Sequence, residues 1–231
     1  LIIATADDLG TAGPDYSYGW GLVNIAKAID LVGDYATNPG NKLIVEGKLI
    51  SVTNIVDQYV YESDGLTPFI ATISWTDPKG VSTSSNDSTT PVLVNNLNLK
   101  VTAPDGTTTF LPYVLNRASP ANAATTGVNN VDNTEQVRIA SPVAGLYTVQ
   151  IDFSGSLTGG SQYYSLIMQG VKKNITQGLP LPISYTLGAT AGSLQEIFIN
   201  GSNFLLGANV TLLKTGSSNV VLTNKEVTPE V

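Results

Sequence analysis

The chain has 231 residues, of which 42% are hydrophobic and 13% charged, with a net charge of −7 and neither cysteine nor histidine. This composition excludes a charge-rich disordered chain, and its acidity disfavours nucleic acids and anionic membranes as partners. The lack of cysteine excludes disulfides and thiolate metal sites, and the lack of histidine excludes a serine nucleophile activated by histidine. No apolar run approaches the roughly 20 residues that span a bilayer.

The N-terminal region is the part of the sequence that favours helix. Leu22, Ile25, Ala26 and Ile29 recur at helical spacing and predict a helix over 22–29. Gly33 is expected to close this helix. Residues 1–6 are expected to form the last turns of another helix, which ends in a turn at residues 7–10.

From about residue 42 the sequence alternates apolar and polar residues with a period of two, as half-buried strands do. The clearest alternating segments are 69–75, 97–101 and 147–153, and the weaker ones are 43–50, 56–62, 135–140 and 162–169. The Pro104-Asp105-Gly106 sequence predicts a tight turn, and residues 80–90 and 113–131 predict long connections. These features predict a mainly β protein with an antiparallel β-sandwich or jelly roll.

The last part of the chain is expected to form a separate, small β domain. Gly178, Pro180 and Pro182 predict a linker over 172–182. Beyond the linker, the sequence predicts a strand, a turn at Gly201 and a second strand. We therefore expect three parts, at 1–36, 42–172 and 183–231.

The first part carries a resemblance to a known family. It contains Gly13-Pro14-Asp15 and Tyr18-Gly19-Trp20-Gly21-Leu22-Val23-Asn24. This segment resembles the C-terminal end of the catalytic domain of subtilisin-like serine proteases, where it follows the helix that bears the catalytic serine. Because the Gly-Thr-Ser motif of the serine and the aspartate and histidine segments are absent, no catalytic residue is predicted in this chain.

The two later parts also resemble modules of bacterial proteins. The middle part contains Ser74-Trp75-Thr76-Asp77-Pro78 and Leu93-Val94-Asn95-Asn96-Leu97-Asn98-Leu99. It looks like the β-sandwich that follows the catalytic domain in a group of secreted bacterial subtilases. The last part contains Ile199-Asn200-Gly201-Ser202-Asn203-Phe204, which is similar to immunoglobulin-like domains of the transcription-factor and plexin type.

The sandwich resemblance raises the question of a calcium site. Relatives usually carry aspartates at the positions of Asn96 and Asn98. Asp77, Asn96, Asn98 and Asp132 are the candidate ligands for Ca²⁺, which accepts amide and main-chain oxygens as well as carboxylates. The alternative is that Asp77 caps a strand end and the asparagines bond to the backbone. No other cofactor is expected.

Other acidic and aromatic residues admit two interpretations. Asp132 and Glu135 could serve as a glycosidase pair, but their proximity in sequence does not establish a cleft. Asp7, Asp8 and Asp15 lie in turns, where aspartates commonly bond to their own backbone. The tyrosines and tryptophans are expected mainly in the core. Tyr163 and Tyr164 are adjacent on a strand, so one of them should face outward.

Together these features predict the non-catalytic C-terminal region of a secreted or cell-surface bacterial subtilisin-like endopeptidase. Its expected partners are the catalytic domain and the protein or peptide substrates of the parent enzyme. An apolar face on the helix at 22–29 must then pack on the sandwich or remain exposed. The rival hypothesis is an adhesion module that binds glycans or proteins at the cell surface.

Overall fold

The structure is a computed structural model that describes residues 1–41, 43–82, 84, 86, 88–173, 181–187, 197–202, 211–212 and 220–221. The chain divides into two compact units, Leu1–Ile175 and Thr176–Val231. Within the described ranges, no helix has the length and apolar character needed to cross a membrane.

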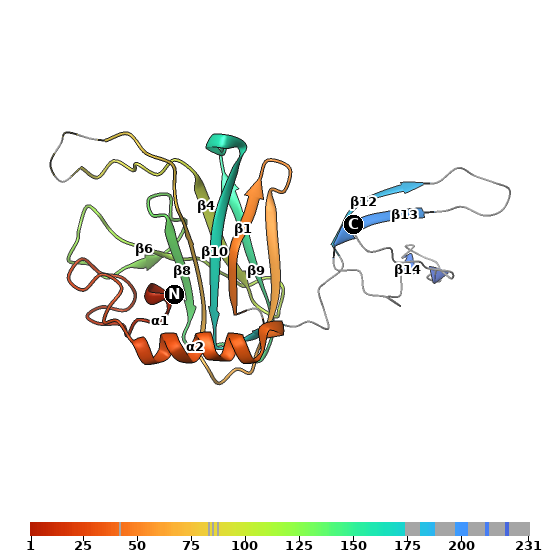
Figure 1. Ribbon diagram of the computed structural model, residues 1–231, viewed down its shortest axis with the longest axis horizontal. Coiled ribbons are helices and arrows are strands. Elements are labelled where there is room, and N and C mark those ends of the chain that lie inside the picture. The colour runs from red at the N-terminus through yellow and green to blue at the C-terminus, as the bar shows by residue number, and fades with distance from the viewer. Residues whose placement is uncertain are drawn as a thin grey trace. The chain divides into compact units, whose positions relative to one another are not determined.

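The first unit is built around two antiparallel sheets that pack face to face as a β-sandwich (Figure 1). The first sheet has the order β1-β10-β3-β8 and the second the order β11-β2-β9-β4-β5. The first sheet comprises β1 (Ile44–Ser51), β10 (Ser161–Gln169), β3 (Phe69–Trp75) and β8 (Thr134–Ile139). The second comprises β11 (Lys172–Lys173), β2 (Val56–Ser63), β9 (Gly145–Ser154), β4 (Asn96–Thr102) and β5 (Thr109–Phe110).

The alternating patterns of the sequence correspond to these strands, and the prediction of a mainly β, antiparallel sandwich is confirmed. In β4, Leu97, Leu99 and Val101 are buried, whereas the residues between them are partly exposed. The same alternation places the apolar residues of β3 and β9 in one shared core, because successive side chains of a strand point to opposite faces.

The long connections carry little regular structure. Between β5 and β8, the short strands β6 (Tyr113–Val114) and β7 (Thr125–Thr126) pair with each other. The turn predicted after β4 is present: Gly106 has a φ of 71°, and Asp105 Oδ1 accepts the N–H groups of Thr107 and Thr108 at 2.8 Å each. Two short 3-10 helices, η1 (Pro39–Asn41) and η2 (Thr158–Gly160), complete the first unit.

The N-terminal helices differ in part from the prediction. Helix α1 (Ile2–Thr5) lies within the expected segment, whereas α2 (Ile25–Thr37) starts and ends later than residues 22–29. It starts at Ile25 because the Asn24 side chain accepts the Lys27 N–H at 2.9 Å as an N-cap. The prediction that Gly33 ends the helix is wrong. The helix continues to Thr37. It ends there because Asn38 precedes Pro39, and the residue before a proline disfavours the helical conformation.

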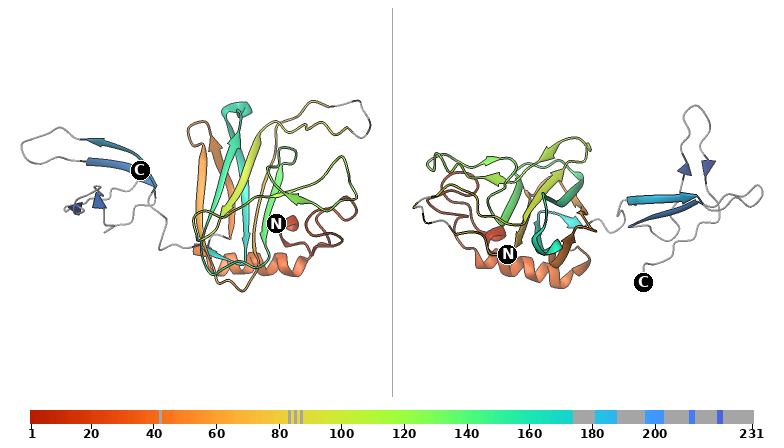
Figure 2. Two further views of the ribbon diagram at one scale, coloured as in Figure 1. Left: turned by 180° about the vertical axis from the view of Figure 1, so that it is seen from behind. Right: turned by 90° about the horizontal axis from the view of Figure 1, so that it is seen from above.

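Residues 1–37 pack on the first sheet rather than forming a separate body. Ala4 of α1 and Leu31 of α2 belong to the same buried cluster as the sandwich core. Gln169 of β10 donates its side-chain amide to the main-chain oxygen of Ala4. Figures 1 and 2 show α2 running crosswise to the strands near one end of the sandwich. The expected parts 1–36 and 42–172 therefore lie in a single compact unit.

The second unit contains two strand pairs. Strand β12 (Leu181–Leu187) pairs antiparallel with β13 (Ile197–Ser202), and β14 (Thr211–Leu212) pairs with β15 (Val220–Val221). The predicted turn at Gly201 is wrong, because β13 runs through Gly201 and pairs it with Pro182. Residues 174–180 of the expected linker and residues 203–204 of the immunoglobulin-like motif lie outside the described residues. The immunoglobulin-like assignment stays a prediction.

Candidate functional site

The aspartates of the N-terminal segment hold its turns. Asp15 accepts the N–H groups of Thr11, Ser17 and Tyr18 at 3.1, 2.9 and 2.7 Å, and Asp8 accepts that of Gly13 at 3.0 Å. These bonds lower the pKa of Asp15, the bond from Tyr18 having the largest effect. The turn interpretation is thereby confirmed for Asp8 and Asp15, whereas the Asp7 carboxylate bonds side chains.

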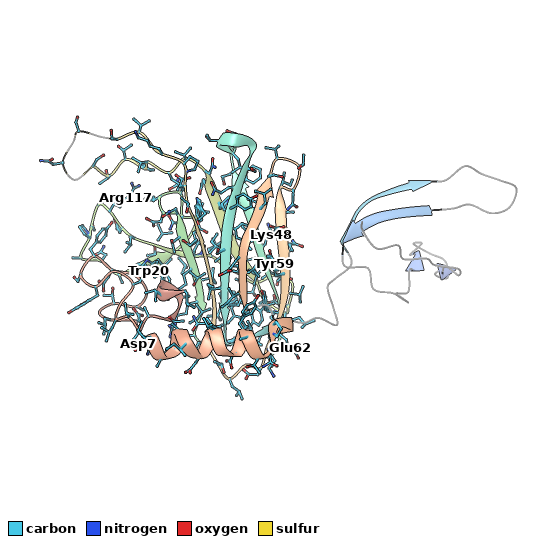
Figure 3. All side chains as sticks on the ribbon, viewed as in Figure 1. Asp7, Trp20, Lys48, Tyr59, Glu62 and Arg117 are labelled. Atoms are coloured by element: carbon cyan, nitrogen blue, oxygen red, sulfur yellow. The ribbon has the colours of Figure 1, made fainter. Side chains whose placement is uncertain are left out.

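Asp7 connects these turns to the start of α2. It accepts the side-chain amide of Asn24 at 2.8 Å and forms an ion pair with Lys27, and both contacts lower its pKa, that of Lys27 more. Its backbone pairs with Leu22 through two hydrogen bonds of 2.8 Å each. Gly21 makes this pairing possible, because a Cβ at that position would lie 2.1 Å from the main-chain oxygen of Asp7. Figure 3 labels Asp7 beside the start of α2 and Trp20 on the preceding loop.

An apolar stripe lies on the solvent side of α2. We define it by Ile25, Ile29 and Val32 of the helix, which are 55%, 65% and 44% exposed, together with Leu22, which is 59% exposed on the β-bridge before the helix. A neighbouring face carries the buried residues Ala28 and Leu31, of which Leu31 belongs to the sandwich core. The face that the sequence pattern identified as apolar is therefore exposed, and the helix packs through a second apolar face.

A polar edge lies where the two sheets approach each other at β4 and β8. Glu135 of β8 is 1% exposed, and its Oε2 accepts the N–H of Leu99 in β4 at 2.6 Å. Burial raises the pKa of Glu135 to about 8; the Leu99 bond opposes this shift, and the negative charges of Asp132 and Asp152 add to it. The sequence analysis considered Glu135 only as half of a glycosidase pair and missed this contact between sheets.

Three of the four predicted calcium ligands have separate hydrogen-bond partners. Asp77 binds the N–H groups of Val94 and Asn95 through its two oxygens, at 2.7 and 2.8 Å. Asn98 donates to Asp152 at 2.7 Å, and Asp132 accepts from Asn129 at 2.9 Å. Asn96 differs, because its Oδ1 is buried and has no hydrogen-bond donor. Asp77 thus binds the backbone directly before β4, in agreement with the alternative that it caps a strand end, whereas Asn98 bonds side chains and not the backbone.

Two motifs of the middle part contact each other directly. Trp75 donates its indole N–H to the main-chain oxygen of Asn95 at 3.0 Å, and Asp77 binds the backbone on either side of the Val94–Asn95 peptide bond. Asn95 is fully buried and donates to Gln162 of β10 at 2.8 Å. Hydrogen bonds thus hold the Ser74–Asp77 segment against the Leu93–Asn95 segment at the end of β3.

The sequence analysis also missed a buried polar network between β1, β2 and β10. Tyr164 donates its hydroxyl to Asp57 at 2.7 Å and shares a hydrogen bond of 2.9 Å with the Tyr59 hydroxyl. Lys48 lies 3.8 Å from Asp57, and Figure 3 shows Lys48 and Tyr59 at the same edge of the sandwich. Because Tyr164 is hydrogen-bonded to both Asp57 and Tyr59, we assign the network a structural role.

No catalytic nucleophile with a histidine base can form in this chain, because the sequence lacks histidine. No protein-family model matches the chain, and no curated protein matches its sequence. The exposed stripe beside and on α2 is the surface feature of the described residues that points to a partner.

Proposed function

We propose that the chain is the non-catalytic C-terminal region of a subtilisin-like endopeptidase and that it docks the body of the catalytic domain through α2. The observation that carries the proposal is the exposed apolar stripe of Leu22, Ile25, Ile29 and Val32. Contiguous apolar surface on a soluble protein commonly marks an interaction site. The stripe lies on the segment that carries the resemblance to the end of a subtilase catalytic domain.

The local structure supports a surface prepared for docking. Asn24 caps α2, and Asp7 fixes the residues that precede it, so the four stripe residues start from a defined backbone. Leu31 fastens another face of α2 to the sandwich core. A partner on the stripe would thus be held rigidly against the sandwich, which would support the catalytic domain or shape the access of protein and peptide substrates. This role places the protein outside the cell, with the secreted enzyme.

The coding region upstream of Leu1 tests the family assignment. The proposal expects an upstream segment with the Gly-Thr-Ser motif of a subtilase nucleophile, preceded by its histidine and aspartate segments. An upstream region without these segments would overturn the proposal.

A binding experiment tests the docking surface. The upstream catalytic domain is produced separately, with its serine replaced by alanine, and titrated with the full chain by calorimetry. Ile25→Asp with Ile29→Asp should abolish the binding, because two charges would be buried in an apolar contact. Val81→Asp is the matched control, since Val81 is an exposed apolar residue on a loop. Equal binding by the stripe variant and the control would exclude the stripe as the interface.

The adhesion hypothesis keeps one specific observation in its favour. Tyr163 is 62% exposed on β10 and lies opposite Leu49, an exposed residue of β1. An aromatic ring beside an aliphatic side chain on an open sheet face suits stacking against a sugar ring or a peptide. Binding to immobilised glycans that is lost in Tyr163→Ala and kept in the Ile25→Asp/Ile29→Asp variant would favour adhesion over docking.

A further inference from the structure

A hollow of about 460 Å³ lies between two loops of the first unit. One loop joins β6 to β7, and the other, which contributes Thr89, joins β3 to β4. The volume falls within the range of small-molecule sites, about 300–1,000 Å³. The lining residues that the argument uses are Thr89, Leu115, Asn116, Arg117, Asn122 and Thr125. Figure 3 shows Arg117 on the side of the first unit that lies away from Lys48 and Tyr59.

Hydrogen bonds hold the loop between β6 and β7 in a defined shape. The two strands pair at its base. Asn116 Oδ1 accepts the N–H groups of Ala118 and Ser119 at 3.1 Å each. The main-chain oxygen of Ser119 in turn accepts the N–H of Asn122 at 2.9 Å. Because the Asn116 oxygen is engaged in the loop, the group that this side chain can offer a ligand is its NH₂, which is a donor.

Arg117 brings a positive charge to the hollow. Its Nη1 donates to the main-chain oxygen of Thr89, which connects the two loops. The guanidinium has more N–H groups than this one oxygen can accept. The described residues form ion pairs at Lys27 and Lys48 but not at Arg117, and no acidic residue lines the hollow. In a chain of net charge −7, this arrangement favours an anionic ligand and disfavours a cation.

We propose that the hollow at Arg117 binds a carboxylate. A carboxylate presents two oxygens in one plane, which match the parallel N–H groups of a guanidinium in a bidentate pair. The NH₂ of Asn116 and the hydroxyl of Thr125 are further donors of the lining, and Leu115 offers an apolar contact to the rest of the ligand. Such a carboxylate belongs to a small organic acid or to the C-terminus of a peptide. The hollow shares no residue with the stripe of α2, so the inference is independent of the proposed function.

Nuclear magnetic resonance of the ¹⁵N-labelled full chain tests the site. The chain holds two arginines, Arg117 and Arg138, so their side-chain Nε–H signals report separately on the hollow and on an exposed reference position. The probes are sodium acetate and N-acetyl-trialanine at constant ionic strength, with the C-terminally amidated peptide as control. Both carboxylates should shift the Arg117 signal saturably at millimolar concentrations, and the amidated peptide should not. Tighter binding of the peptide assigns a peptide C-terminus, whereas equal or tighter binding of acetate assigns a small organic acid.

Two variants and a control identify the ligand group. Arg117→Gln should abolish the saturable shifts of the Asn116 and Asn122 amides, whereas Arg138→Gln, which loses the same charge at an exposed position, should keep them. Arg117→Lys keeps the charge without the planar fork and should weaken binding several-fold. If Arg117→Gln alters the loop, Arg117→Lys decides, and an affinity equal to that of the unchanged chain rejects the site.

Three results would overturn the proposal. The first is the absence of a saturable shift with either carboxylate, and the second is an equal response to the amidated peptide. The third is inorganic phosphate that binds more tightly than both carboxylates, because the hollow would then be a site for a different anion.

Discussion

Glu135 accepts the main-chain N–H of Leu99 at 2.6 Å and thereby joins β8 of one sheet to β4 of the other. The N–H lies on the part of β4 that has no neighbouring strand, because β5 pairs only with Val101 and Thr102. The carboxyl group takes the place of the strand that is missing there. A buried acid thus covers an open sheet edge, which would otherwise offer its backbone to another chain.

Glu135 should make the stability of the protein depend on pH. Its folded-state pKa is raised to about 8, mainly by burial, above the value of 4.5 for a free glutamic acid. The protonated form is therefore favoured by folding. Its contribution is complete below about pH 4.5 and is lost as pH rises through about 8. The melting temperature should fall as the pH rises from about 4.5 to about 8, and Glu135 should cause no further fall above that range.

The Glu135→Gln variant is the control for this pH dependence, because its amide resembles the protonated acid and does not titrate. Its melting temperature should change less over the same pH range. Equal slopes in the variant and the unchanged protein would show that another group causes the fall.

The two apolar faces of α2 should differ sharply in their effect on stability. Leu31 is buried, and Leu31→Ala should lower the free energy of unfolding by about 2–4 kcal/mol through lost burial and a cavity. Ile29→Ala, on the exposed stripe, should change it by less than about 0.5 kcal/mol. Urea denaturation of both variants measures the difference. A similar loss in both would mean that the stripe packs within the isolated chain.

Gly21→Ala and Gly33→Ala should change the stability of the protein in opposite directions. Gly21 has a φ of 100°, and a Cβ there would lie 2.1 Å from the main-chain oxygen of Asp7, so Gly21→Ala should destabilise the turn before α2. Gly33 lies inside α2 with no atom within 4 Å of an added Cβ. Gly33→Ala should therefore stabilise the protein by about 0.5–1 kcal/mol. Thermal unfolding compares the pair, and destabilisation by Gly33→Ala would contradict the helix assignment at this position.

The sequence predicted the strands well because each strand is marked by a local alternation. In β4, Leu97, Leu99 and Val101 identify the buried face from neighbouring residues alone. Helix α2 was harder to predict, because it has two apolar faces and only the packing of Leu31 on the sandwich decides which is buried. The role of Glu135 was not predictable from local patterns, since its partner Leu99 is 36 residues away and lies in the other sheet.

Two adjacent tyrosines on β10 point to opposite faces of the sheet, and one of them was expected to face outward. Tyr163 is 62% exposed and Tyr164 is 1% exposed, so the expectation is confirmed. Burial raises the pKa of Tyr164, which is therefore a neutral hydroxyl that donates to Asp57 at 2.7 Å. Asp57 is itself buried, and a lost donor would leave its carboxylate with fewer hydrogen bonds.

Tyr164→Phe should lower the free energy of unfolding by about 1–3 kcal/mol, the usual cost of an unsatisfied buried polar group. Tyr163→Phe removes the hydroxyl from the neighbouring residue. It should cost less than about 0.5 kcal/mol, because the Tyr163 side chain is exposed. Urea denaturation at pH 7 measures both values. Asp57→Asn with Tyr164→Phe should cost less than the sum of the single changes, because the two side chains share one hydrogen bond. Strictly additive losses would show that the bond between Tyr164 and Asp57 does not couple β10 to β2.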